Sequence, residues 1–141
     1  MYQVDAFASK LFSGNPAAVV ILESSLSEDL MQSIALENNL SETAFIRKDE
    51  QKYYIRWFSP SCEIDLCGHA TLASAFVFFN HIDKTEDVFE VESTKNGTLK
   101  INKRDDYLYL DFPTDDFKEN HDYDIVEKAL GVKPFELYKG R

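Results

Sequence analysis

The chain has 141 residues, 44% hydrophobic and 13% aromatic, which suffices for one folded domain with a buried core. Its 25 acidic residues outnumber 15 basic ones, and the net charge of −10 argues against nucleic acid or an anionic membrane as the main partner. The apolar runs are shorter than the roughly 20 residues of a membrane-spanning helix, and the N-terminus lacks a signal-peptide pattern. With two cysteines and no disulfide framework, we predict a cytoplasmic location.

The first predicted elements are two strands and a helix. Residues 2–8 alternate between polar and apolar positions, and residues 17–22 form a short apolar run behind the turn residues 13–16. Ser27 fits the N-cap of a following helix, because two acidic residues come directly after it. The apolar stripe predicted for this helix consists of Leu30, Met31, Ile34, Ala35 and Leu36.

A second helix is predicted from about residue 69 to 81, after two strands at 42–48 and 52–58. Its apolar residues lie on all sides, whereas an amphipathic surface helix would keep one polar face. We therefore expect the sheet to enclose this helix as a central axle.

The remaining pattern predicts an antiparallel meander and a short helix. Residues 88–94, 97–103 and 107–112 are strand-like, and Asn96-Gly97 is a hairpin signal. A helix over 122–132 would close at Gly131. The predicted class is α+β, with a mostly antiparallel, curved, barrel-like sheet wrapped around a central apolar helix.

Polar residues gather at the start of the predicted central helix, in the segment 61–71, SCEIDLCGHAT. The first N–H groups of a helix lack intrahelical partners and the helix dipole is positive there, so a carboxylate or an oxyanion is favoured. Gly68 would let such a ligand approach the backbone. The alternative is that Asp65 or Thr71 only satisfies the start of the helix.

Cys67 and His69 each have a functional and a structural interpretation. A neutral His69 could donate a hydrogen bond or move a proton, or it could be a structural residue. A thiol at a helix N-terminus has a lowered pKa and can act as base or nucleophile, but cysteine also packs as a small hydrophobe. Positions two apart do not face each other on a helix, which argues against a cysteine-dependent hydrolase. Cys62-x4-Cys67-x-His69 lacks a further ligand, so we expect no metal.

Glu42 and Asn15 are the other candidates. Glu42 stands between a predicted helix and a predicted buried strand, where a desolvated carboxylate facing a cleft would suit general acid–base work. The alternative for Glu42 is a solvated turn residue. Asn15 is first a turn residue, and its amide could also contact a substrate.

The segments GNPAAV (14–19), SETAF (41–45) and DLCGHATLA (65–73) resemble, in order and spacing, the N-terminal half of the PhzF family, the phenazine biosynthesis-like isomerases. The likeness covers roughly residues 2 to 130. The family shares its fold with diaminopimelate epimerase: two similar α+β halves, each with a sheet around a central helix, and an active site between them. The resemblance implies a domain over 1–130, the start of an interdomain crossover or a tail over 131–141, and no second family domain.

The resemblance also implies residue roles. Glu42 falls on the family's proton-shuttling carboxylate, and His69 is a second catalytic candidate. Gly68 and His69 fall on the substrate-binding pair at the helix start, to which we add Asn15 and Ala70. Cys67, which falls on one of the two catalytic thiols of the epimerases, and Asp65 are secondary candidates.

The function implied is a PhzF-like isomerase or epimerase in a biosynthetic process. The family's namesake moves a double bond in a cyclic amino acid without metal or organic cofactor, so we expect no cofactor and a small (cyclic) amino or carboxylic acid as substrate. Family members are roughly twice as long, and their second half supplies the opposite wall of the site. The alternative is therefore a catalytically incomplete half-protein that binds a small carboxylate or another protein. Two copies could also pair as a homodimer and rebuild a cleft.

Overall fold

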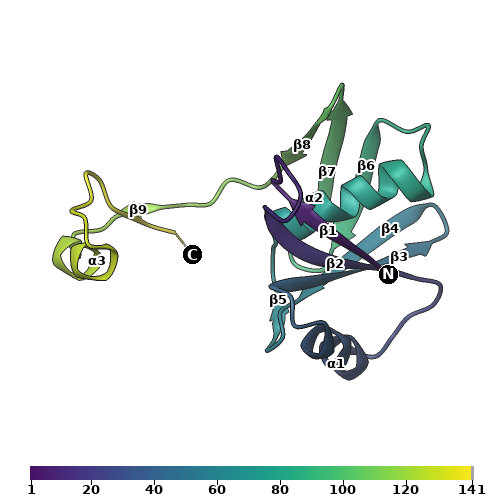
Figure 1. Cartoon of the computed structure of the whole chain (residues 1–141), viewed down its shortest axis with the longest axis horizontal. Helices are drawn as coiled ribbons and strands as arrows, with labels where there is room; N and C mark the ends of the chain where they lie inside the picture. The colour runs from purple at the N-terminus through teal and green to yellow at the C-terminus, as the bar shows by residue number, and fades with distance from the viewer. Residues whose placement is uncertain (141) are drawn as a thin grey trace.

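The computed structural model describes residues 1–140 and places a curled sheet around a helix, with a C-terminal arm to one side (Figure 1). Strands follow the order β1-β2-β3-β4-β6-β7-β8, and β5 pairs with β4. The strands are β1 (Tyr2–Ala6), β2 (Asn15–Leu22), β3 (Glu42–Asp49), β4 (Lys52–Phe58), β5 (Glu63–Ile64), β6 (Val88–Ser93), β7 (Gly97–Arg104), β8 (Tyr107–Asp111), β9 (Lys118–Glu119) and β10 (Tyr138–Lys139). The helices are α1 (Glu28–Asn38), α2 (Gly68–Val77), the π-helix η1 (Phe78–Ile82) and α3 (Tyr123–Leu130).

The sheet is mostly antiparallel, and the exceptions are the parallel pairs β2–β3 and β4–β6. A parallel pair needs a crossover connection, and α1 and α2 lie in these two crossovers. The predicted α+β class, with a barrel-like sheet around a helix, is confirmed. No helix within residues 1–140 is long and apolar enough to cross a membrane.

The first helix, α1, packs on the outer face of the sheet. The Ser27 hydroxyl accepts a hydrogen bond from the Leu30 N–H at 3.3 Å, which confirms the predicted N-cap. Met31 and Ala35 are buried in a small cluster with side chains of β3 and β4. The predicted stripe is wrong at Leu30 and Leu36, which are 47% and 61% exposed, because only a narrow face of α1 meets the sheet.

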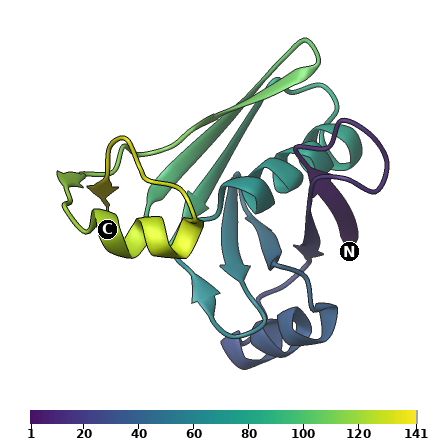
Figure 2. The ribbon, with the colours of Figure 1, turned by 60° about the vertical axis from the view of Figure 1, so that its left-hand side comes forward.

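The central helix, α2, lies in the concave face of the sheet (Figure 2). The expectation that the sheet encloses it is wrong on one side, where Phe76 is 46% exposed. β1 and β8 are the two edges of the sheet and do not pair, so the barrel stays open between them. A cavity of about 1140 Å³ occupies this gap. Its apolar lining includes Val4, Leu72, Phe76, Leu108, Leu110 and Phe112.

The C-terminal arm, residues 113–140, extends away from the half-barrel (Figure 1). β9 pairs with β10, and α3 lies between them in the chain. The Gly131 N–H donates to the Glu127 carbonyl from a left-handed conformation, which confirms the predicted helix end. No residue of α3 is buried. The domain boundary at residue 130 stays a prediction, and Arg141, at the end of the predicted crossover or tail, lies outside the described residues.

Candidate active site

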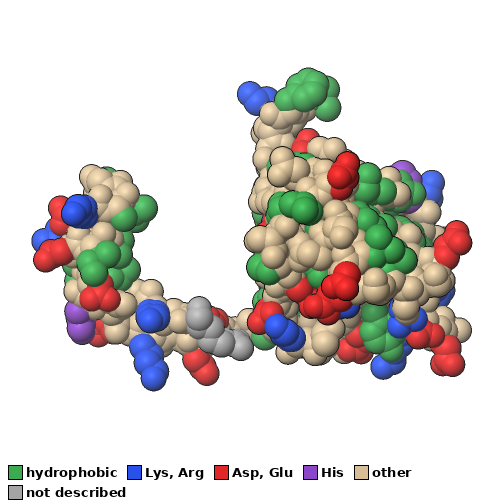
Figure 3. Space-filling model, turned by 90° about the horizontal axis from the view of Figure 1, so that it is seen from below, with side chains coloured by type: hydrophobic (Ala, Val, Ile, Leu, Met, Phe, Trp, Pro, Cys, Tyr) green, Lys and Arg blue, Asp and Glu red, His purple; other side chains and the backbone are tan. Residues whose placement is uncertain are grey.

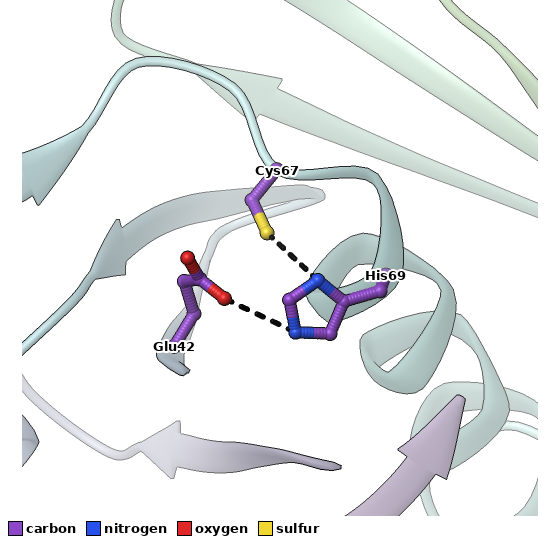
Figure 4. A group of neighbouring side chains, drawn as sticks. All are labelled: Glu42, Cys67 and His69. Carbon is purple, nitrogen blue, oxygen red and sulfur yellow. Dashed lines mark hydrogen bonds and ion pairs between the residues drawn. The ribbon is translucent and has the colours of Figure 1, made fainter. Parts of the chain in front are cut away.

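Three reactive side chains meet at the N-terminal end of α2 (Figure 4). Glu42 is the first residue of β3, Cys67 is the N-cap of α2, and His69 is the second residue of that helix. Glu42 Oε2 lies 3.1 Å from His69 Nε2. Cys67 Sγ lies 3.4 Å from His69 Nδ1. The imidazole ring therefore bridges a carboxylate and a thiol.

The parallel pairing of β2 with β3 positions this site. Ala17 of β2 pairs with Glu42 of β3, so the two parallel strands begin at the same end of the sheet. Both strands also contact α2. Ser41 Oγ is 3.0 Å from Asn15 Oδ1 and 3.5 Å from His69 Nε2. The structure thus links Asn15 to the cluster through Ser41, a residue that the sequence analysis missed. Its only signal is that it directly precedes Glu42 at the start of a predicted strand.

The turn before Asn15 requires a glycine. Gly14 has φ +96°, a left-handed conformation that side chains disfavour. A Cβ at this position would lie 2.5 Å from the Ala6 carbonyl oxygen, which is too close for any residue but glycine. The tight turn brings Asn15 to the site end of β2.

The site is largely withdrawn from water. The side chains of His69 and Glu42 are 10% and 19% exposed. Burial raises the pKa of the Cys67 thiol to about 11, and the negative charge of Glu42 adds to this rise. The lowered pKa expected for a thiol at a helix N-terminus is therefore wrong. The N–H groups of Ala70 and His69 do favour the thiolate, but desolvation outweighs them.

The direction of these hydrogen bonds depends on the tautomer of His69. In the Nε2–H tautomer, His69 donates its Nε2–H to the Glu42 carboxylate. Nδ1 is then unprotonated and accepts a hydrogen bond from the S–H of Cys67. In that tautomer the imidazole orients the Glu42 carboxylate through one hydrogen bond and contacts the thiol through the other ring nitrogen.

The contact between Cys67 and His69 corrects an argument made from spacing. Cys67 has extended backbone angles, φ −137° and ψ 112°, and lies outside the helix. The rule that helical positions two apart diverge does not apply, so the argument against their contact is wrong. Thr71 Oγ1 donates to the Cys67 carbonyl at 2.6 Å, so this hydrogen bond satisfies a carbonyl and not a free N–H of the helix start.

The other predicted site residues lie around the cluster. Asp65 is exposed and forms an ion pair with Lys95, so the structure does not bring it to the cluster. Gly68 lines the cavity between β1 and β8, and a Cβ there would make only an ordinary contact with Phe112 at 3.6 Å. Ala70 is fully buried, so only its backbone could reach a ligand.

Metal-binding capacity does not follow the cysteine spacing. Cys62 is exposed and is not part of the cluster. Within residues 1–140, the group that could hold a metal ion is Glu42, Cys67 and His69, whose ligand atoms all lie within 4.8 Å of one another.

Comparison with known proteins places the chain in a family. A family model described as phenazine biosynthesis-like protein matches residues 4–124. The chain belongs to the PhzC-PhzF family. An uncharacterized isomerase of Pseudomonas aeruginosa is 47% identical over 136 residues, which cover 96% of this chain and 52% of that protein. A phenazine biosynthesis-like domain-containing protein of Homo sapiens is 42% identical over 144 residues, covering 93% and 49%. The chain spans about half the length of the curated relatives it matches.

Solved structures support the same assignment. A PhzF-family protein of Enterococcus faecalis has 52% identity and a TM-score of 0.88, and the match covers 99% of this chain and 53% of that one. A predicted epimerase of Pseudomonas aeruginosa has 18% identity and a TM-score of 0.72, covering 94% and 50%, which shows the shared fold alone. The PhzF resemblance and the epimerase-like fold predicted from the sequence are confirmed.

Proposed function

We propose that this chain is an isomerase or epimerase domain that moves a proton at a carbon atom of a small amino or carboxylic acid. The observation that carries the proposal is the 3.1 Å contact of Glu42 with His69 at the N-terminal end of α2. Membership of the PhzC-PhzF family, with curated relatives named isomerases, supports the reaction class.

Glu42 acts as the acid–base group in this proposal. Its carboxylate takes a proton from a carbon atom, and the C–H electron pair moves into the adjacent carboxylate or conjugated system of the substrate. The protonated Glu42 then returns the proton to carbon at a different position. Proton transfer by a positioned side chain contributes about 10²–10⁴-fold in rate, and the His69 hydrogen bond holds Glu42 for this role.

The helix start holds the substrate. The N–H groups of Gly68, His69 and Ala70 are the first of α2; they lack intrahelical partners, and the helix dipole favours an anion there. A substrate carboxylate bound there would place its neighbouring carbon near Glu42. Asn15, linked to the cluster through Ser41, would contact a polar group of the substrate.

The second wall of the cleft comes from another copy of the chain in this proposal. The half-barrel has an open cavity between β1 and β8, and Phe76 is half exposed in its lining. Hydrophobic side chains are visible on both the half-barrel and the arm (Figure 3). Isologous pairing would cover these surfaces and bring a second Glu42 toward the first. Sedimentation at micromolar concentration should show a dimer, and a monomer there would contradict the pairing.

The alternative function is a binding module that lacks catalysis. The open cavity of about 1140 Å³ favours it, because the site has one wall within this chain. This alternative predicts that a small carboxylate binds at the start of α2 while no proton at carbon exchanges.

Solvent deuterium exchange tests the proposal. The chain is incubated in D₂O with a panel of cyclic and linear amino acids, and incorporation at carbon is followed by mass spectrometry. The Glu42→Gln variant should lose at least about 10²-fold in rate, since a positioned acid–base group contributes that much. Glu37→Gln, at an exposed position of α1, is the matched control and should keep the full rate. Full activity of the Glu42 variant, or no incorporation across the panel, would overturn the assignment.

A further inference from the structure

The site cluster contains the donor types that bind zinc in proteins. Glu42 offers a carboxylate oxygen, Cys67 a sulfur and His69 a ring nitrogen, and the three ligand atoms lie within 4.8 Å of one another. Zinc takes carboxylate, thiolate and imidazole ligands. Sequence spacing gave no reason to expect a metal, because the third donor comes from β3 and is distant in the chain.

The separation of the thiol from the imidazole fits a tetrahedral ion. With Zn–S of about 2.3 Å and Zn–N of about 2.0–2.1 Å, neighbouring donors of a tetrahedral site are about 3.5 Å apart. Cys67 Sγ and His69 Nδ1 are separated by 3.4 Å. In this structure Glu42 Oε2 contacts Nε2, the other ring nitrogen, at 3.1 Å. Ligation by Glu42 on the Nδ1 side therefore requires its side chain to turn about its own rotatable bonds, and the three ligand atoms already lie within 4.8 Å of one another.

A second-shell partner for the histidine is also in place. A histidine that binds a metal through one nitrogen donates its other N–H to a nearby oxygen, which fixes the ring. If Nδ1 faces the metal, Nε2–H points toward Ser41 Oγ, 3.5 Å away. Ser41 Oγ is itself held by Asn15 Oδ1 and by the Pro16 carbonyl, at 3.0 and 3.1 Å.

We propose that the N-terminal end of α2 is a zinc-binding site formed by Glu42, Cys67 and His69. As the Zn–S bond forms, the S–H bond of Cys67 breaks and the proton passes to solvent; no electron is transferred. Three protein ligands leave the fourth position for water or a small acid, as in open zinc sites. Because Glu42 is also the proposed acid–base group, bound zinc would block proton transfer, and this one consequence rests on the proposed function.

Cobalt(II) replaces zinc as a coloured probe of the site. The untagged chain is titrated with Co²⁺, and the thiolate-to-cobalt charge-transfer band and the visible bands of tetrahedral Co²⁺ are recorded. We expect one equivalent to give both, and Zn²⁺ to displace it. Cys67→Ser should remove the charge-transfer band and weaken zinc binding by more than about tenfold, since even the loss of a second-shell partner costs 10–100-fold.

Matched variants decide between sites. Cys62→Ser changes the exposed cysteine five positions earlier and should keep the band and the affinity. His69→Gln should lose tetrahedral binding and serves as the second test if Cys67→Ser does not fold, which circular dichroism checks. The proposal is overturned if Cys62→Ser loses metal binding while Cys67→Ser keeps it. It is also overturned if all three variants bind metal as the unchanged chain does, or if the unchanged chain binds no metal at micromolar concentration. These readouts need no catalysis, so an inactive chain leaves the test intact.

Discussion

Glu42 and His69 come from different elements, a sheet strand and the central helix, and their side chains meet with Oε2 3.1 Å from Nε2. The contact forms because β3 begins at the same end of the sheet as the first turn of α2. It joins a carboxylate that can accept a proton to an imidazole that can orient it.

Replacing His69 should therefore slow proton exchange more than it weakens substrate binding. His69→Gln is expected to lower the exchange rate at saturating substrate by about 10–100-fold, the equivalent of a hydrogen bond to a charged group worth about 1.5–3 kcal/mol. Deuterium incorporation against substrate concentration separates rate from binding. His121→Gln, an exposed histidine on the arm, is the control. An equal loss in that variant would remove His69 from the mechanism.

The two cysteines should differ sharply in alkylation. Cys62 is exposed, whereas Cys67 is buried and its pKa is raised to about 11. The thiolate is the reactive form, so the shift from 9.0 to about 11 alone lowers the reactive fraction of Cys67 about 100-fold at neutral pH. Iodoacetamide at pH 8, followed by peptide mass mapping, should label Cys62 first. Labelling of Cys67 should accelerate as the pH rises toward 11. Equal rates at pH 8 would contradict the buried position of Cys67.

Substitution of Gly14 should destabilise the fold. Gly14→Ala introduces a Cβ 2.5 Å from a backbone oxygen at φ +96°, and we expect a loss of about 1–3 kcal/mol in the free energy of unfolding. Gly97→Ala is the matched control, because Gly97 also has positive φ, +67°, but open space around its Cβ position. Urea denaturation measures both variants. A Gly14 variant no less stable than the Gly97 variant would refute the steric argument.

Glu63 should make stability depend on pH in acid. Arg56 Nε and Nη2 donate to the two oxygens of Glu63 at 2.6 and 2.8 Å, and Nη2 also reaches Glu28 of α1. These hydrogen bonds lower the pKa of Glu63 below its ordinary 4.5. The unfolded chain then binds the proton more readily, so the stabilisation is complete above pH 4.5 and is lost as the pH falls through the lower, folded-state value.

The variant Glu63→Gln should weaken the dependence of the free energy of unfolding on pH in acid. We expect it to lose about 1–2 kcal/mol at pH 7 and to depend less on pH below 4.5, as measured by urea denaturation at several pH values. Glu90→Gln removes an exposed ion pair with Lys100 and should change stability by less than about 1 kcal/mol. If the stability of the Glu63 variant fell with pH below 4.5 as steeply as that of the unchanged chain, the role of the Arg56–Glu63 pair would be contradicted.

Local signals predicted much of the fold. The N-cap at Ser27, the helix end at Gly131 and the hairpin at Asn96-Gly97 depend on chemistry within a few residues, so they are readable in the sequence. The short strand β5 is different, since two residues carry no periodicity and form a strand only because β4 lies beside them. The exposure of Phe76 likewise depends on which strands fail to pair, and that is a property of the whole sheet.

The site was predictable in part. Polar residues before apolar runs, together with the family resemblance, pointed to Glu42 and His69, and the structure brings them together. The bond between Ser41 and Asn15 depends on the parallel register of two strands, which the sequence pattern does not reveal. The contact of Cys67 with His69 depends on the helix beginning one residue later than the thiol.

The crossover position of α2 also bears on the order of folding. This helix lies in the chain between β4 and β6, and these strands then pair side by side, with Tyr53 opposite Val91. Such long-range parallel pairing is slow to form, because a large loop must close first. Trp57, the chain's one tryptophan, is buried in β4. Its fluorescence in refolding experiments should therefore report the slow phase in which β4 pairs with β6.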